Sequence, residues 1–293
     1  MRVLFDLSAL HGNRLELLRS APTKEARRKR RIVFLHTPIF LNEILQGYGS
    51  SRAGNRWREN LSFACDLEPA GYFLDKEQIW RDELVCGRGR LARHFMPERK
   101  TRRWNGAANL RAEINRAIES GDLSQVWKAA ETEIDEGHNK KRAQRKIAVA
   151  VREEIAEKMR DGSIRGRLKD ASLAEILRRD TLFWGNALMD LVDTRHANSL
   201  RDQWAQNPAR YPFYTSFVEG VAYFGFHAGI LHQEGIDTNA QADYEQLCYL
   251  NWADVFVSDE QGFLRSAFND LWKPRKKHLL TCQEFVDLVK RLA

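Results

Sequence analysis

The chain has 293 residues, of which 43% are hydrophobic and 30% are charged, and it carries a net charge of +7. This composition suits a globular protein of one large or two ordinary domains, and the modest positive excess favours an anionic partner such as nucleic acid. No apolar run is long enough to span a membrane, and an acid at position 6 interrupts the apolar region that a secretory signal needs. The four cysteines are too scattered for a zinc knuckle or a disulfide framework. We therefore expect a cytoplasmic protein with no membrane partner.

Two short strands and a helix are predicted at the N-terminus. Residues 2–5 form a short β-prone run that ends at Asp6, and residues 32–37 form a second β-prone run. The next segment begins at a proline, which fits the first turn of a helix, so we predict a helix over residues 38–47. Glu43 lies beside the apolar face of that helix, which is unusual for an idle surface acid.

The middle of the chain, from about residue 50 to residue 235, shows long helical patterns and no convincing strand. Between Arg88 and Lys169 there are 21 Lys or Arg against 12 Asp or Glu, an excess larger than that of the whole chain. Basic and aromatic residues alternate over residues 93–106, as suits contacts with phosphates and stacked bases, although such a run is often only a solvated surface. The residues predicted to bind nucleic acid are Arg99, Lys100, Arg102 and Arg103.

The last sixty residues return to an alternation of strands and helices. We predict helices over residues 240–251, 260–271 and 282–292, and strands over residues 255–258 and 278–281. Strands that are separated by helices favour parallel βαβ units. The N-terminal strands would complete the same sheet.

Four acids are placed to converge at one edge of this sheet. Sites in an open parallel sheet form beyond the carboxyl ends of the strands, and both Asp6 and Asp259 follow strands. Glu43 and Asp243 flank the apolar stripes of two helices. Because clustered carboxylates repel one another unless cations compensate them, and because hard oxygen ligands suit Mg²⁺ or Mn²⁺, the pattern indicates a divalent metal site.

Each acid also has a simpler interpretation. Ser258 and Gln261 match a capping box, which would make Asp259 part of a helix N-terminus. Asp6 would be a turn residue, Glu43 an acid on a helix surface, and Asp243 an acid in the first turn of a helix.

The order of these segments resembles the PIN domain nucleases. The matching segments are "VLFD", "TPIFLNEIL", "ADYEQLCYLNWADVFVSDEQGF" and "HLLTCQEFVDLV", and Ser8 matches a small polar residue that often follows the first Asp of the family. The resemblance implies that the catalytic and metal-binding acids are Asp6, Glu43, Asp243 and Asp259. The long gap between Glu43 and Asp243 departs from compact family members.

The same resemblance implies an α/β fold, a PIN-like α/β/α sandwich with a central, mostly parallel sheet. Residues 1–48 and 236–293 would form the nuclease core. Residues 49–235 would form a large α-helical insertion, basic in its 88–169 part.

A protein of this kind would be a nuclease that uses Mg²⁺ or Mn²⁺, and an endoribonuclease on the family resemblance alone. One alternative is a nucleic-acid-binding or scaffold protein on a degenerate PIN-like fold. Another is a toxin or defence effector, whose insertion would contact an antitoxin, another protein partner or the substrate. Metal binding with and without the Asp6 and Asp259 side chains would discriminate between the first two.

Overall fold

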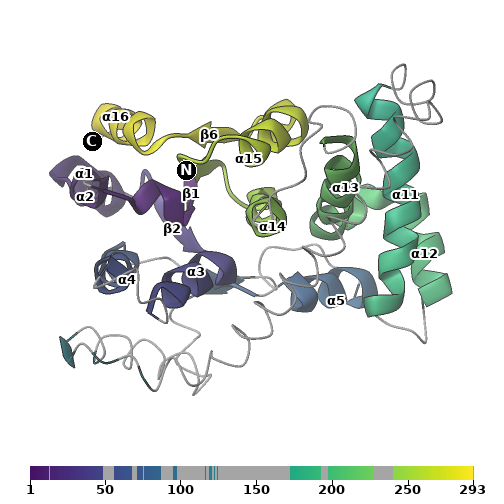
Figure 1. Cartoon of the computed structure of the whole chain (residues 1–293), viewed down its shortest axis with the longest axis horizontal. Helices are drawn as coiled ribbons and strands as arrows, with labels where there is room; N and C mark the ends of the chain where they lie inside the picture. The colour runs from purple at the N-terminus through teal and green to yellow at the C-terminus, as the bar shows by residue number, and fades with distance from the viewer. Residues whose placement is uncertain are drawn as a thin grey trace, which may run out of the picture. The chain divides into compact units, whose positions relative to one another are not determined.

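The structure is a computed structural model (Figure 1). The chain divides into two compact units. The first unit comprises Met1–Asp75, Leu91–Glu136 and Tyr249–Ala293, and the second comprises Lys76–Arg90 and Gly137–Cys248. The described residues are 1–12, 14–48, 56–67, 71–74, 76–86, 95–97, 116, 119–120, 122, 124, 172–192, 197–227 and 240–292. Among them, no helix combines the length and apolar character that crossing a membrane requires.

The first unit is built on a mostly parallel sheet. In the described part of the chain it has six strands in the order β4-β3-β2-β1-β5-β6. All neighbouring pairs are parallel except that of β3 with the edge strand β4. The strands are β1 (Arg2–Phe5), β2 (Val33–His36), β3 (Gly71–Phe73), β4 (Phe95–Pro97), β5 (Val255–Val257) and β6 (His278–Leu280).

The mixed α/β class and the strands predicted near both ends of the chain are confirmed. The expectation of no strand between residues 50 and 235 is wrong, because β3 and β4 come from that range and extend the sheet. The sequences of these two strands, Gly71–Phe73 and Phe95–Pro97, each include a residue that disfavours strands, a glycine or a proline, so no strand pattern stood out there. The predicted domain boundaries near residues 48 and 236 stay a prediction.

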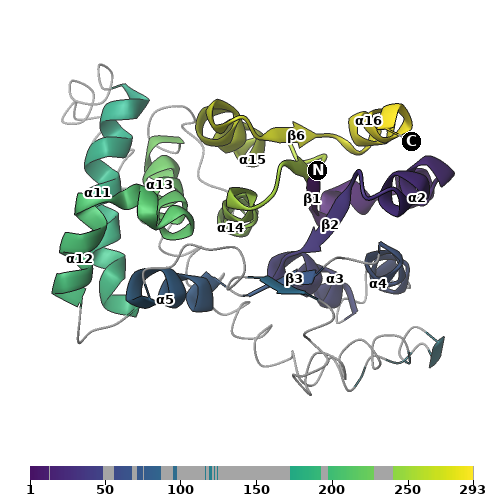
Figure 2. The same cartoon turned by 180° about the vertical axis from the view of Figure 1, so that it is seen from behind.

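Helices of the first unit pack in neighbouring pairs around this sheet. In Figures 1 and 2, α16 lies beside α2, and α3 lies beside α4. The segment 14–28, which showed no clear pattern in the sequence, forms two short helices. The helices are α1 (Arg14–Leu18), α2 (Ala21–Arg28), α3 (Pro38–Tyr48), α4 (Arg56–Asp66), α15 (Phe263–Ala267) and α16 (Cys282–Leu292).

Local hydrogen bonds explain where two of these helices begin. Thr37 precedes α3, and its Oγ1 accepts a hydrogen bond from the Phe40 N–H at 3.1 Å. At the start of α16, Thr281 and Glu284 form a capping box in which each side chain accepts from the backbone N–H of the other. The predicted helices over 38–47 and 282–292 are confirmed by these elements.

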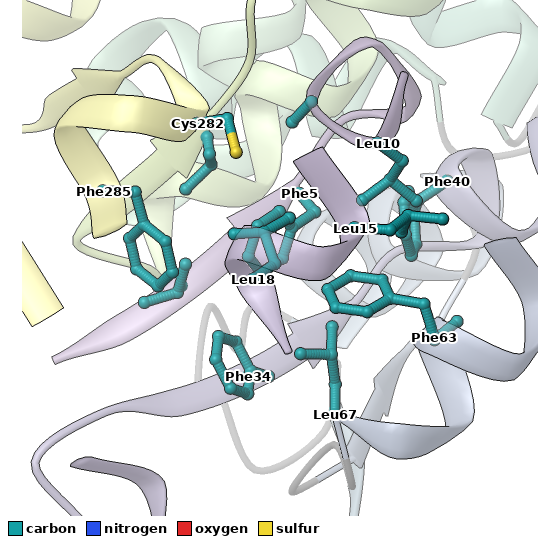
Figure 3. Packing of buried hydrophobic residues seen from close by; sticks show 14 of the residues in the cluster. Phe5, Leu10, Leu15, Leu18, Phe34, Phe40, Phe63, Leu67, Cys282 and Phe285 are labelled. Carbon is teal, nitrogen blue, oxygen red and sulfur yellow. The ribbon is translucent and has the colours of Figure 1, made fainter. Parts of the chain in front are cut away.

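Phe5 is at the centre of the core of the first unit (Figure 3). Its ring centroid lies 5.6 Å from that of Phe34, 6.0 Å from that of Phe63 and 5.5 Å from that of Phe285. Leu4, the preceding residue, is equally buried, as expected for a central strand covered on both faces. The aromatic contacts hold β2, α4 and α16 against β1, and so fix the strand that ends at Asp6.

The described residues of the second unit are mainly helical. Helix α13 packs against α5, α11 and α14. The apolar run from Phe217 to Leu231 predicts a buried helix, and α13 (Pro212–Phe226) confirms it over Phe217–Phe226, whereas residues 228–231 lie outside the described residues. The helices are α5 (Lys76–Cys86), α11 (Leu173–Val192), α12 (Ala197–Gln206), α13 (Pro212–Phe226) and α14 (Ala240–Cys248).

Gly220 allows α13 and α14 to approach closely, and its replacement by alanine should destabilise the protein. A Cβ at this position would lie 1.7 Å from Cε1 of Tyr244, whose ring is buried and whose hydroxyl donates to the Ser216 carbonyl. We expect Gly220→Ala to lower the free energy of unfolding by about 1–3 kcal/mol in urea denaturation. Gly225→Ala on the same helix meets no atom within 4 Å and should raise it by up to about 1 kcal/mol. Equal effects of the two substitutions would contradict this packing.

Candidate functional site

The carboxyl ends of β1 and β5 form the candidate site. The two strands are parallel neighbours with Phe5 opposite Val257, and the Asp6 N–H donates to the Val257 carbonyl at 3.0 Å. From β1 the chain continues to β2 on one side, whereas from β5 it continues to β6 on the other. Because the strand order reverses between them, the residues after β1 and β5 border the crevice where open parallel sheets bind ligands.

Asp6 is a buried carboxylate with several hydrogen-bond donors. Its side chain is 4% exposed, so it requires donors to offset the loss of water. Ser258 Oγ donates to Oδ2 at 2.8 Å and the Ser8 N–H at 3.3 Å, and the Ser8 hydroxyl also donates to this oxygen. Asp6 thereby caps the 3₁₀ helix η1 (Leu7–Leu10), so its simpler interpretation as a turn residue also holds.

Asp259 is connected to Asp6 through Ser8. The backbone N–H of Asp259 donates to Ser8 Oγ at 3.1 Å. Its carboxylate Oδ2 lies 3.0 Å from Nη1 of Arg14, a distance close enough for an ion pair but without the alignment of a hydrogen bond. The same Nη1 donates to the Ser8 carbonyl at 2.9 Å. The guanidinium of Arg14 therefore offsets part of the negative charge of this pair of acids, mainly that of Asp259.

The capping-box interpretation of Ser258 is wrong. Helix α15 begins only at Phe263, and its N-cap is Gly262, which adopts a positive φ of 73°. Ser258 Oγ donates to Asp6 and accepts from the Glu260 N–H at 3.1 Å instead. A serine at the end of β5 therefore serves the buried carboxylate of the neighbouring strand.

Cys282, the first residue of α16, also faces this group. Burial raises the pKa of its thiol to about 11, and the negative charge of Asp259 acts in the same direction while Arg14 opposes it. At neutral pH this thiol stays protonated. Its burial is that of a core side chain.

Glu43 and Asp243, the other predicted acids, lie on helices. Glu43 is half-buried in α3, which packs beside η1 in the same unit. Asp243 is half-buried in the first turn of α14, which belongs to the second unit, so its membership of the acid group stays a prediction. The predicted nucleic-acid contacts fall outside the described residues, namely Arg99, Lys100, Arg102 and Arg103.

The donor set around Asp6 and Asp259 matches hard divalent cations in kind. Carboxylate and hydroxyl oxygens are the ligands that Mg²⁺ and Mn²⁺ prefer. Searching the described residues for three or more His, Cys, Asp or Glu side chains able to hold one metal gives no such group. Two carboxylates alone would need a further acid to hold a divalent ion, and the metal site stays a prediction.

Sequence reasoning missed two members of this group. Ser258 had a usable signal, because a small polar residue at the end of a buried strand stands beside the end of its neighbour. No sequence signal pointed to Arg14, because its approach to Asp259 depends on how η1 and α1 turn the chain back over the strand ends.

A second buried acid, Glu83 in α5, lies outside this group. Its Oε1 accepts from the Phe213 N–H at 3.1 Å and its Oε2 from the Tyr214 N–H at 2.9 Å. Burial raises its pKa to about 7, and these two N–H groups oppose the shift. The first N–H groups of a helix have no partner within the helix, so Glu83 in α5 caps the start of α13 by accepting from them.

No family model, no curated protein and no solved structure matches the chain. The assignment of a function therefore depends on the geometry of the site.

Removing the Ser258 hydroxyl should destabilise the protein. Ser258→Ala takes one donor from the buried Asp6 carboxylate, and we expect the free energy of unfolding to fall by about 1–3 kcal/mol. Ser266→Ala in α15 is the control, because its hydroxyl makes no hydrogen bond within the described residues, and its effect should stay within about 0.5 kcal/mol. Urea denaturation of both variants measures the difference, and equal effects would contradict the assigned role of Ser258.

The pKa of Glu83 predicts a pH-dependent effect of Glu83→Gln. Because the folded pKa is raised above the unfolded value, the stability gained from the protonated carboxyl is complete below about pH 4.5 and is lost as the pH rises through about 7. The stability of the variant relative to the wild type should therefore increase by up to about 3 kcal/mol between these limits. Urea denaturation across this pH range measures it, and a constant difference would refute the shift.

Proposed function

We propose that this protein is a divalent-metal-dependent nuclease that hydrolyses phosphodiester bonds. The observation that supports it is the pairing of Asp6 and Asp259, through Ser8, at the carboxyl ends of two adjacent parallel strands. This crevice is where open sheets of this type bind ligands. RNA is favoured over DNA only by the resemblance to the PIN domain nucleases.

In this proposal Asp6 and Asp259 hold one or two Mg²⁺ or Mn²⁺ ions, and Glu43 and Asp243 complete the set. Such ions polarise a scissile phosphate and lower the pKa of an attacking water. The likeness of these four acids in chain order to the PIN domain nucleases is a second argument for the assignment.

The surrounding residues hold the carboxylates in place. Ser8 and Ser258 fix the orientation of Asp6 by donating to one of its oxygens. Arg14 lies beside Asp259 and reduces the repulsion between the two acids. Its side chain is 37% exposed, so the guanidinium is also accessible to a phosphate group of the substrate.

A second candidate is a nucleic-acid-binding protein on a degenerate nuclease fold. The ion pair between Arg14 and Asp259 favours it, because the guanidinium already supplies the positive charge that a metal ion would bring. In that case Mn²⁺ would not bind to the wild-type protein in calorimetric titration. Binding of Mn²⁺ that is lost in Asp259→Asn would favour the nuclease.

The substitution Asp259→Asn should abolish metal-dependent cleavage and leave the fold intact. The amide is a far weaker cation ligand of the same size, and we expect the rate of RNA cleavage with Mg²⁺ or Mn²⁺ to fall at least about 100-fold. Asp6→Asn should have the same effect on cleavage, with some loss of stability because Asp6 is buried.

Asp254→Asn is the matched control, because Asp254 lies at the amino end of the same strand, where its Oδ2 accepts from the Arg2 N–H at 2.7 Å. Its cleavage rate should equal that of the wild type. Full activity of a folded Asp259→Asn variant would eliminate the proposed site.

A further inference from the structure

A strongly basic surface covers α2 and the turn that follows it. Between Arg19 and Arg31 the chain carries seven Lys or Arg and a single acid. Two adjoining hollows of about 450 and 460 Å³ open here, and Lys24 and Arg27 line both of them. The cations that line these hollows, called here the α2 basic surface, are Arg19, Lys24, Arg27, Arg28 and Arg30.

Acids within the protein neutralise only part of this surface. Glu25 pairs with Arg28 at 2.8 Å, and Asp66 pairs with Arg19 at 3.1 Å. Lys24 and Arg30 make no hydrogen bond or ion pair through their side chains with any described residue. These two cations are therefore available to an external anion.

Arg30 adopts a backbone conformation that favours glycine. Its φ is 56°, and it follows the C-cap of α2, where its N–H donates to the Arg27 carbonyl at 2.8 Å and the Arg31 N–H donates to the Ala26 carbonyl at 2.9 Å. This is a Schellman motif, in which glycine fits the left-handed position with least strain. Arginine at this position adds a cation to the second hollow, although its backbone conformation is strained. Backbone strain of this kind is common at residues that bind ligands.

The walls of the hollows point to the class of ligand. Interfaces between proteins require exposed apolar or aromatic side chains as anchors. The apolar lining residues Phe34 and Phe63 are each only 1% exposed, so their rings offer no such anchor. What the hollows present is a set of cations, mainly arginines, whose forked N–H groups pair with phosphate oxygens.

We propose that the α2 basic surface binds the phosphodiester backbone of a nucleic acid strand, with neighbouring phosphates in the two hollows. The turn after α2 leads into β2, and the N-terminal amino group of Met1 donates to the Arg31 carbonyl at 2.9 Å, so this turn lies at the amino edge of the sheet. Asp6 and Asp259 lie at the carboxyl edge. The surface is thus separate from the candidate metal site and does not depend on catalysis.

Two substitutions test this surface in the full-length protein. Arg30→Gly removes a cation and relaxes the backbone, so we expect the affinity for an unstructured RNA strand to fall about fivefold and the salt dependence of log K to lose about 0.7 of its slope. The melting temperature of this variant should rise by about 1–3 °C, which shows that the loss of binding does not arise from unfolding. Lys24→Gln should lower the affinity for the RNA strand by the same factor. Fluorescence anisotropy at several salt concentrations in EDTA, which prevents metal-dependent cleavage, measures both.

Lys276→Gly is the matched control, since Lys276 is another exposed basic residue with a positive φ, 60°, outside this surface. Its affinity and slope should equal those of the wild type. A DNA strand of the same sequence should bind about as well as RNA, because both have the same phosphodiester backbone.

Three outcomes would overturn the proposal. The first is unchanged binding in both Arg30→Gly and Lys24→Gln. The second is an equal loss in Lys276→Gly, which would reflect net charge alone. The third is competition by a polyglutamate peptide as strong as that by RNA, which would indicate an acidic protein partner. Because binding is measured without divalent metal, failure here leaves the nuclease proposal standing, and failure of Asp259→Asn to lose cleavage leaves this one standing.

Discussion

The buried carboxylate of Asp6 is the constraint on which the candidate site depends. A carboxylate that is 4% exposed needs donors, and here they come from Ser8 and from Ser258, which are far apart in the sequence. Meeting that need holds the ends of β1 and β5 together. The backbone N–H of Asp259 then bonds Ser8, which brings a second acid to the same edge. One requirement for hydrogen bonding thus assembles the whole group.

The aromatic core holds β1, the strand that leads to Asp6, in place. Phe5 directly precedes Asp6, and its ring contacts Phe34, Phe63 and Phe285 from β2, α4 and α16. Removal of one large side chain from such a cluster typically costs about 3–5 kcal/mol. Because the strand is held firmly up to its last residue, the position of the Asp6 carboxylate is well defined, which a ligand site needs.

Buried acids have two different roles in this chain. Asp6 is satisfied mainly by hydroxyl groups at the carboxyl ends of two strands, close to a second acid and an arginine. Glu83 is satisfied by backbone N–H groups at the start of α13, and burial raises its pKa. A shifted pKa alone would point to Glu83 as functional, whereas its partners identify it as a helix cap. The surroundings of an acid, and not its burial, separate a candidate site from a structural contact.

The sequence by itself determined the strands around Phe5 and Val257, the helices that begin at Pro38 and Cys282, and the acids that follow the two central strands. These features depend on local patterns of apolar residues, prolines and capping side chains, which act over a few residues. Only the tertiary structure added the strands β3 and β4, because their sequences contain a glycine and a proline and their strand conformation depends on pairing with neighbours. It also decided the partners of Ser258 and Arg14, since hydrogen bonds across the sheet depend on register and on the path of the chain, which no local pattern encodes.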